Sequence, residues 1–110
     1  MAKTPEGRVK DAIKKYLTEL GVWFAGRPQP KEVTGWMYMP VSMTSLGVNG
    51  IPDFCGIYKG RPLYIEAKAP GGKVSELQKQ RIAEIRAAGG LALVVASVGE
   101  LELALRTHGL

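Results

Sequence analysis

Apolar and charged residues alternate along the first segment of the chain with the period of an α-helix. Thr4 is a suitable N-cap, Pro5 fits the first helical position, and Gly21 can end the helix in a left-handed conformation. The pattern therefore predicts an amphipathic helix that begins at Pro5 and buries one face. The apolar positions of that face are Val9, Ala12, Ile13, Tyr16, Leu17 and Leu20.

Short apolar segments bounded by glycine and proline follow this helix and predict β-strands. We expect strands at residues 22–25 and 36–41, and then two further strands at residues 53–58 and 63–69 that form a hairpin. The region from residue 26 to residue 50 is rich in proline and glycine and still contains large apolar side chains. These are Trp36, Met37, Tyr38, Met39, Met43 and Leu46.

The last third of the chain predicts a helix, a strand and a short helix. Helical spacing begins at Ser75 and ends at Gly89-Gly90, with Leu77, Ile82, Ile85 and Ala88 as its apolar positions. The continuous apolar run at residues 91–98 predicts a strand that is covered on both faces, and residues 100–106 predict a final short helix. This order favours an α/β (α+β) fold in which helices flank a mixed central sheet.

The turn between the two hairpin strands decides which side chains meet across them. A two-residue loop at Lys59-Gly60 makes the numbers of paired residues sum to 119 and places Asp53 opposite Glu66. A four-residue loop over residues 59–62 makes the sum 121 and places Asp53 opposite Lys68. Both loops keep the three side chains on one face, because side chains alternate along a strand, whereas a three-residue loop separates them.

Two acids and one amine on neighbouring strands are the groups that hydrolyse a phosphodiester with a divalent metal. We expect Asp53 and Glu66 to bind Mg²⁺, with the backbone carbonyl of Ala67 as a third oxygen ligand. Lys68 can orient the attacking water or stabilise the charged transition state. The alternative is structural, with Asp53 starting a strand and Glu66 and Lys68 on the solvated face of an edge strand.

Two further polar residues extend the apolar stripes of the predicted helices toward this hairpin. Gln78 lies four residues before Ile82, and Glu6 lies three residues before Val9. Gln78 can instead complete a capping box with Ser75, and Glu6 can complement the dipole of the first helix. Both structural readings remain open beside the site reading.

The charge of the chain favours a polyanionic partner such as nucleic acid. Fifteen Lys and Arg residues against ten Asp and Glu residues give a net charge of +5. The aromatic side chains of Trp23, Trp36 and Tyr38 could stack on unpaired bases, but in a small chain we expect them in the core. Basic residues near the hairpin motif that could hold flanking phosphates are Lys59, Arg61, Lys73, Lys79 and Arg81.

Length and composition limit the other possibilities. At 110 residues we expect one domain, residues 1–110, with a modest core. The longest apolar run, residues 91–96, is far shorter than the roughly 20 residues that span a bilayer, and we expect a cytosolic protein without a membrane partner. The single cysteine, Cys55, excludes an internal disulfide and a cysteine-based zinc site, and we assign no catalytic role to it or to His108.

Several motifs in this order resemble the PD-(D/E)xK nuclease superfamily and, within it, the VRR-NUC family. The superfamily pattern is Pro52-Asp53, the triplet Glu66-Ala67-Lys68 and Gln78. The family pattern adds Gly50-Ile51 before Pro52, Ile65 before Glu66, Ala69-Pro70-Gly71-Gly72 after Lys68, Ser75, and Ala87-Ala88-Gly89-Gly90. The resemblance implies a restriction-endonuclease-like core of order αβββαβ.

The resemblance also implies an activity. It implies a Mg²⁺- or Mn²⁺-dependent DNA endonuclease with Asp53 and Glu66 as metal ligands, Lys68 as the catalytic amine, Gln78 as an accessory residue and Glu6 as a further acid. Stand-alone domains of this family, often from phages and bacteria, are similar to Holliday junction resolvases and are expected to be homodimers in a bacterial cell or a phage-infected host. Domains attached to larger repair nucleases prefer flaps.

Three other readings remain beside the junction nuclease. They are a sequence-specific restriction-type nuclease, a catalytically silent nucleic-acid-binding domain, and a basic interaction protein without a nucleic acid partner. Residues 26–49 lie outside the family motifs and are the candidate segment for substrate selection or dimer contact.

Overall fold

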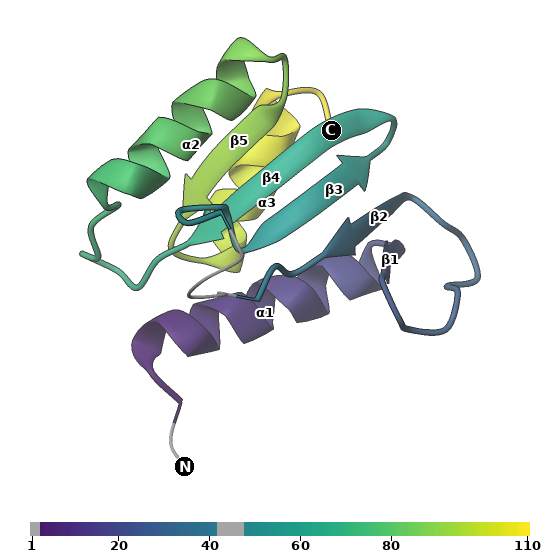
Figure 1. Ribbon diagram of the computed structural model, residues 1–110. Coiled ribbons are helices and arrows are strands. Elements are labelled where there is room, and N and C mark those ends of the chain that lie inside the picture. Colours follow the sequence, from purple (N-terminus) through teal and green to yellow (C-terminus); the bar gives the residue numbers. More distant parts are fainter. Residues whose placement is uncertain (1–2, 42–47) are drawn as a thin grey trace.

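The computed structural model describes residues 3–41 and 48–110, and Figure 1 shows a twisted sheet with helices packed against it. In those residues, no helix has both the length and the apolar composition that crossing a membrane requires. The elements in chain order are α1 (Pro5–Glu19), β1 (Val22–Phe24), β2 (Gly35–Tyr38), β3 (Phe54–Tyr58), β4 (Arg61–Ala67), α2 (Glu76–Ala87), β5 (Leu91–Val95) and α3 (Val98–Thr107).

The five strands form one mixed sheet in the order β1-β2-β3-β4-β5. The two outer pairs, β1 with β2 and β4 with β5, are parallel, and the two inner pairs are antiparallel. The expected αβββαβ order is present as α1, β2, β3, β4, α2 and β5, which is compatible with a restriction-endonuclease-like core. Strand β1 adds an edge strand to that core, and α3 is the expected C-terminal helix.

The hairpin register follows from its turn. Lys59 and Gly60 both have positive φ, 48° and 78°, as a two-residue type I′ turn requires. Phe54 pairs with Ile65 and Tyr58 pairs with Arg61, so the paired numbers sum to 119. The two-residue loop is therefore confirmed, and the alternative four-residue loop is wrong.

Helices α1 and α3 cover one face of the sheet and bury most of the core. Ile13 and Leu17 of α1 and Leu101 and Leu105 of α3 are buried with the inward residues of the strands. Helix α2 lies on the other face, against β5, where Ile82 is its buried side chain (Figure 1). The main inward residues of the strands are Met37, Phe54, Leu63, Ile65 and Leu93.

The face that carries α2 stays partly open, and this corrects two expectations. Trp36 and Tyr38 were expected in the core, but they are 41% and 45% exposed, beside Ile57 of the neighbouring strand. Val94 of β5 is 39% exposed, so the apolar run is not fully covered on both faces. The physical reason is that α2 packs on β5 and leaves the β2–β3 part of this face without a covering helix in the described residues.

Several element ends also differ from expectation. Strand β2 ends at Tyr38 rather than residue 41, and β5 ends at Val95 rather than residue 98. The early end of β5 has a local cause. The Ser97 side chain accepts a hydrogen bond from the Glu100 N–H and caps a helix that begins at Val98. Met43 and Leu46, which were expected near the second strand, lie outside the described residues.

Gly56 allows β3 to approach β2 closely, and this gives a test of the sheet. A Cβ atom at Gly56 would lie 2.0 Å from the Trp36 carbonyl oxygen, which is backbone and cannot move aside. We expect Gly56→Ala to lower the free energy of unfolding by about 2–4 kcal/mol in urea melts. Gly99→Ala is the control, because the nearest atom there lies 3.8 Å away and alanine favours the helix. Equal stability of the two variants would contradict the close approach.

Candidate active site

Asp53 lies where the chain enters β3, and its side chain extends the pairing of the hairpin. Its Oδ2 atom accepts a hydrogen bond of 2.9 Å from the backbone N–H of Ala67 at the end of β4. This contact holds the Asp53 carboxylate beside the residue that follows Glu66. The placement is the one that the two-residue turn predicts.

Glu66 is a buried acid, only 2% exposed, on the face of the sheet that α2 covers. Its Oε2 atom accepts a hydrogen bond of 2.8 Å from Gln78 Nε2 and lies 3.3 Å from Lys68 Nζ. Its Oε1 atom is buried without a hydrogen-bond partner in the described residues. The pKa of Glu66 is raised to about 7, first by burial and then by the charge of Asp53, while Lys68 opposes both effects.

Lys68 lies between two acids from different elements. Its Nζ atom lies 3.3 Å from Glu66 Oε2 and 3.5 Å from Glu6 Oε1, and its side chain is 12% exposed. Its backbone N–H donates to the Val95 carbonyl oxygen, which continues the β4–β5 pairing beyond Ala67. The structure therefore brings Glu6 to the hairpin acids through Lys68.

Gln78 both completes the capping box of α2 and contacts Glu66, the two alternatives that its position in the sequence left open. Its Oε1 atom accepts from the Ser75 N–H, and the Ser75 hydroxyl accepts from the Gln78 N–H, so the capping box of α2 is complete. Its Nε2 atom remains free to donate to Glu66. The cap thereby fixes the direction in which the amide meets the buried acid.

Lys10 is a site residue that the sequence reading missed. Its Nζ atom lies 3.5 Å from Asp53 Oδ1, so each hairpin acid has its own lysine contact. The signal was present in the spacing, because Lys10 lies four residues after Glu6 and such residues share a helix face. It was overlooked because lysines on an amphipathic helix usually face solvent.

The donor set fits a hard divalent cation. The Oε1 atom of Glu66 is a buried acceptor without a donor, and Asp53 is the neighbouring acid. The Ala67 carbonyl points to the same side of β4 as its N–H, which donates to Asp53. The described part of the chain contains no group of three or more His, Cys, Asp or Glu side chains that could hold a metal. Two carboxylates and one carbonyl are sufficient for Mg²⁺, which keeps several waters.

The basic residues expected around the site are mostly elsewhere or paired. Lys59 and Arg61 lie at the turn, about 20 Å along the hairpin from Asp53, so they are not beside the acids, and their role in holding flanking phosphates stays a prediction. Lys79 pairs with Glu76 at 3.2 Å, and Arg81 pairs with Glu84. Lys73 is exposed in the loop after β4 and remains a candidate.

Comparison with protein families matches residues 44–99 to the VRR-NUC domain, which covers just over half of the 110-residue chain. The matched segment contains Asp53, Glu66, Lys68 and Gln78, whereas Glu6 and Lys10 lie before it. Comparisons with curated proteins and with solved structures gave no significant match. The chain belongs to the VRR-NUC family of nuclease-type domains.

Proposed function

We propose that this chain is a divalent-metal-dependent, structure-selective DNA endonuclease that hydrolyses phosphodiester bonds, with branched DNA such as Holliday junctions as its preferred substrate. The observation that carries the proposal is the buried Oε1 atom of Glu66, which has no hydrogen-bond partner in the described residues and lies beside Asp53 and Lys68. A buried acceptor without a donor is costly unless a ligand completes it. A cation completes it and also suits phosphodiester chemistry.

Asp53, Glu66 and the carbonyl of Ala67 would hold the ion, Mg²⁺ or Mn²⁺. When bound, such an ion supplies an activated water and offsets the negative charge that grows on the phosphate. The protein groups divide the remaining work. Gln78 holds Glu66 Oε2 and leaves Oε1 directed at the ion site, and Lys10 holds Asp53 Oδ1.

Lys68 is the proposed catalytic amine. Its ammonium is a compact donor that can orient the attacking water or stabilise the charged transition state. Contacts with Glu66 and Glu6 hold it in place before substrate arrives, so little reorganisation is needed. Glu6 is in this proposal the further acid of the site, and it acts by positioning Lys68.

DNA is the substrate that the family implies, and the net charge of +5 supports it. A homodimer is part of the proposal, because two-fold symmetry suits paired cuts in a four-way junction. The setting that we propose is the cytoplasm of a bacterial cell or of a phage-infected host.

A substrate panel tests this proposal. The protein is incubated with four-way junction, flap, single-stranded and linear duplex DNA, each with Mg²⁺, Mn²⁺ or chelator, and its oligomeric state is measured by size exclusion with light scattering. We expect junction cleavage with either metal and none with chelator. Preferential cleavage of the flap would indicate that the substrate is a flap-containing repair intermediate and not a four-way junction. Salt-dependent DNA binding without cleavage under any condition would indicate a silent binding domain.

The first prediction concerns the two acids. Asp53→Ala or Glu66→Ala should reduce cleavage by at least about 100-fold, because each removes a metal ligand. Junction binding measured in chelator should be kept, because loss of an acid does not weaken attraction to phosphate. Glu19→Ala is the control, since it removes an exposed acid at the far end of α1. Normal cleavage by both site variants would refute the assignment.

The second prediction separates chemistry from metal binding at Lys68. Lys68→Ala should lower kcat by roughly 100- to 1,000-fold at saturating metal, because it removes a preorganised cation from the transition state. The metal concentration for half-maximal activity should change much less. A variant that recovers full kcat at high metal concentration would show that Lys68 serves only to hold the ion ligands.

The third prediction uses stability instead of activity. Glu66 has a native pKa of about 7 against an ordinary value of 4.5, so between these pH values the native state holds a proton that the unfolded state releases. In chelator, the free energy of unfolding should therefore fall as pH rises through this window, by up to about 3 kcal/mol relative to Glu66→Gln.

Metal should reverse this loss. Above pH 7, Mn²⁺ or Mg²⁺ should stabilise the wild-type protein and stabilise Glu66→Gln much less, because the ion binds the ionised acid. Urea melts at several pH values with and without metal measure both effects. Parallel pH curves for the two proteins, or equal stabilisation by metal, would contradict an ion bound at Glu66.

A further inference from the structure

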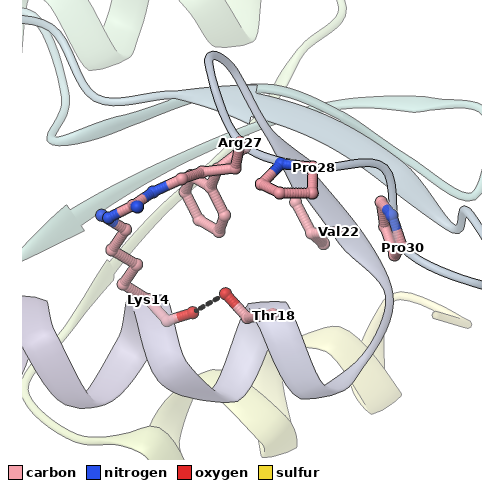
Figure 2. Close-up of a pocket in the computed structure, with 7 residues that line it drawn as sticks. Lys14, Thr18, Val22, Arg27, Pro28 and Pro30 are labelled. Atoms are coloured by element: carbon pink, nitrogen blue, oxygen red, sulfur yellow. Dashed lines mark hydrogen bonds between the residues drawn. The ribbon is translucent and has the colours of Figure 1, made fainter.

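A cavity of about 390 Å³ lies between α1, β1 and the loop that follows β1 (Figure 2). Its floor is apolar, since Val22 and Phe24 of β1 are 2% and 6% exposed. Pro28 and Pro30 of the loop form one wall, and α1 forms the other. The full lining is Lys14, Thr18, Val22, Phe24, Arg27, Pro28 and Pro30.

Two cations line this cavity. Figure 2 shows the Arg27 side chain extending from the loop back toward Lys14, so that both side chains end at the same side of the cavity. The Lys14 Nζ atom lies 5.6 Å from the centre of the Phe24 ring. Neither cation takes part in an ion pair among residues 3–41 and 48–110. Two positive charges that end at the same side of the cavity repel one another and favour an anion between them.

One wall of the cavity belongs to the helix that also carries two residues of the candidate site, Glu6 and Lys10. Glu6, Lys10, Lys14 and Thr18 are spaced by four and therefore share one stripe of α1. Glu6 contacts Lys68 and Lys10 contacts Asp53, and the next residue of the stripe, Lys14, lies about one helical turn beyond Lys10. That step is about 6 Å along the helix axis. Phosphates of one DNA strand follow one another at about 3.4 Å along the duplex axis.

We propose that this cavity is a phosphate subsite, in which Lys14 and Arg27 bind a backbone phosphodiester one or two positions from the scissile bond. The inference rests on the proposed function and deepens it by naming where the substrate strand runs. It replaces Lys59 and Arg61, which lie too far away, and Lys79 and Arg81, which are paired with acids. It also places Arg27, in the segment 26–49, in contact with the substrate.

Binding measurements in chelator test the subsite without any cleavage. A fluorescent four-way junction is titrated at several salt concentrations with wild type, Lys14→Met, Arg27→Gln, the double variant and the control Lys15→Gln. Methionine removes the charge of Lys14, and with it the contact of the ammonium with Phe24, but keeps an unbranched apolar side chain at this position. Lys15 is an exposed lysine of α1 that does not line the cavity.

Each single variant should weaken binding roughly 5- to 10-fold and lower the salt slope by about 1, because one phosphate contact is lost. The double variant should lower the slope by about 2, and the control should change affinity less than about 2-fold. Salt slopes of the pocket variants equal to that of Lys15→Gln would overturn the subsite.

A second measurement changes the DNA instead of the protein. Single neutral methylphosphonate linkages are placed in turn along the junction strands. At one position the neutral linkage should weaken binding to wild type and leave binding to the double variant unchanged, because the double variant has already lost the contact with that phosphate. Equal losses for both proteins at every position would overturn the proposal. A thermal-shift assay with inorganic phosphate distinguishes a DNA phosphate from a free phosphate as the ligand. If phosphate stabilises wild type but not the double variant, and the double variant still binds DNA like wild type, the cavity binds free phosphate and not DNA.

These outcomes separate the subsite from the nuclease proposal. If no DNA is cut but the variants at Lys14 and Arg27 lose salt-dependent binding, the subsite proposal is supported and the endonuclease proposal is refuted. If DNA is cut normally and these variants bind like the control, only the subsite proposal is refuted. If wild type shows no salt-dependent DNA binding, both proposals are refuted.

Discussion

The burial of one carboxylate, that of Glu66, is the constraint on which the site depends. A charged acid inside a protein is costly unless other groups satisfy it. Gln78 and Lys68 satisfy one of its oxygen atoms, and the other remains buried without a partner in the described residues. The pKa of Glu66 is raised because burial and the charge of Asp53 outweigh the effect of Lys68. A cation would remove the cost of this burial, which is why the same feature points to function.

The local features that begin or end the elements around Glu66 also position side chains at the site. The I′ turn at Lys59-Gly60 sets the hairpin register and so brings Asp53 to the end of β4. The capping box begins α2 and at the same time directs Gln78 at the acid. The first turns of α1 add Glu6 and Lys10 from the other side. The geometry of the site is thus set by turns and helix ends.

Turn chemistry and helix capping are local, and for that reason the sequence limited the hairpin to two registers that both keep the three side chains on one face, and it identified the capping box as one of two alternatives for Gln78. Features that depend on which surface a distant helix covers were not predictable in the same way. Trp36 and Tyr38 alternate like core residues, yet their face lies beyond the reach of α2. Lys10 looked like a solvated lysine until the fold brought Asp53 to it. Lys59 and Arg61 are near the motif in sequence and at the other end of the hairpin in space.

Charge balance limits what the proposed site residues can contribute to DNA binding in the metal-free protein. The site combines three acids, Glu6, Asp53 and Glu66, with two lysines, Lys10 and Lys68, which contact those acids. Without a bound cation and with all groups ionised, this cluster carries a net negative charge, and its lysines are already in contact with acids. The metal-free protein therefore needs positive charge outside the cluster to attract DNA, and charge close to the cluster is screened least, since the Debye length is about 8 Å at physiological salt. In the proposed subsite Lys14 and Arg27 supply such charge, whereas the basic turn of the hairpin lies about 20 Å from Asp53.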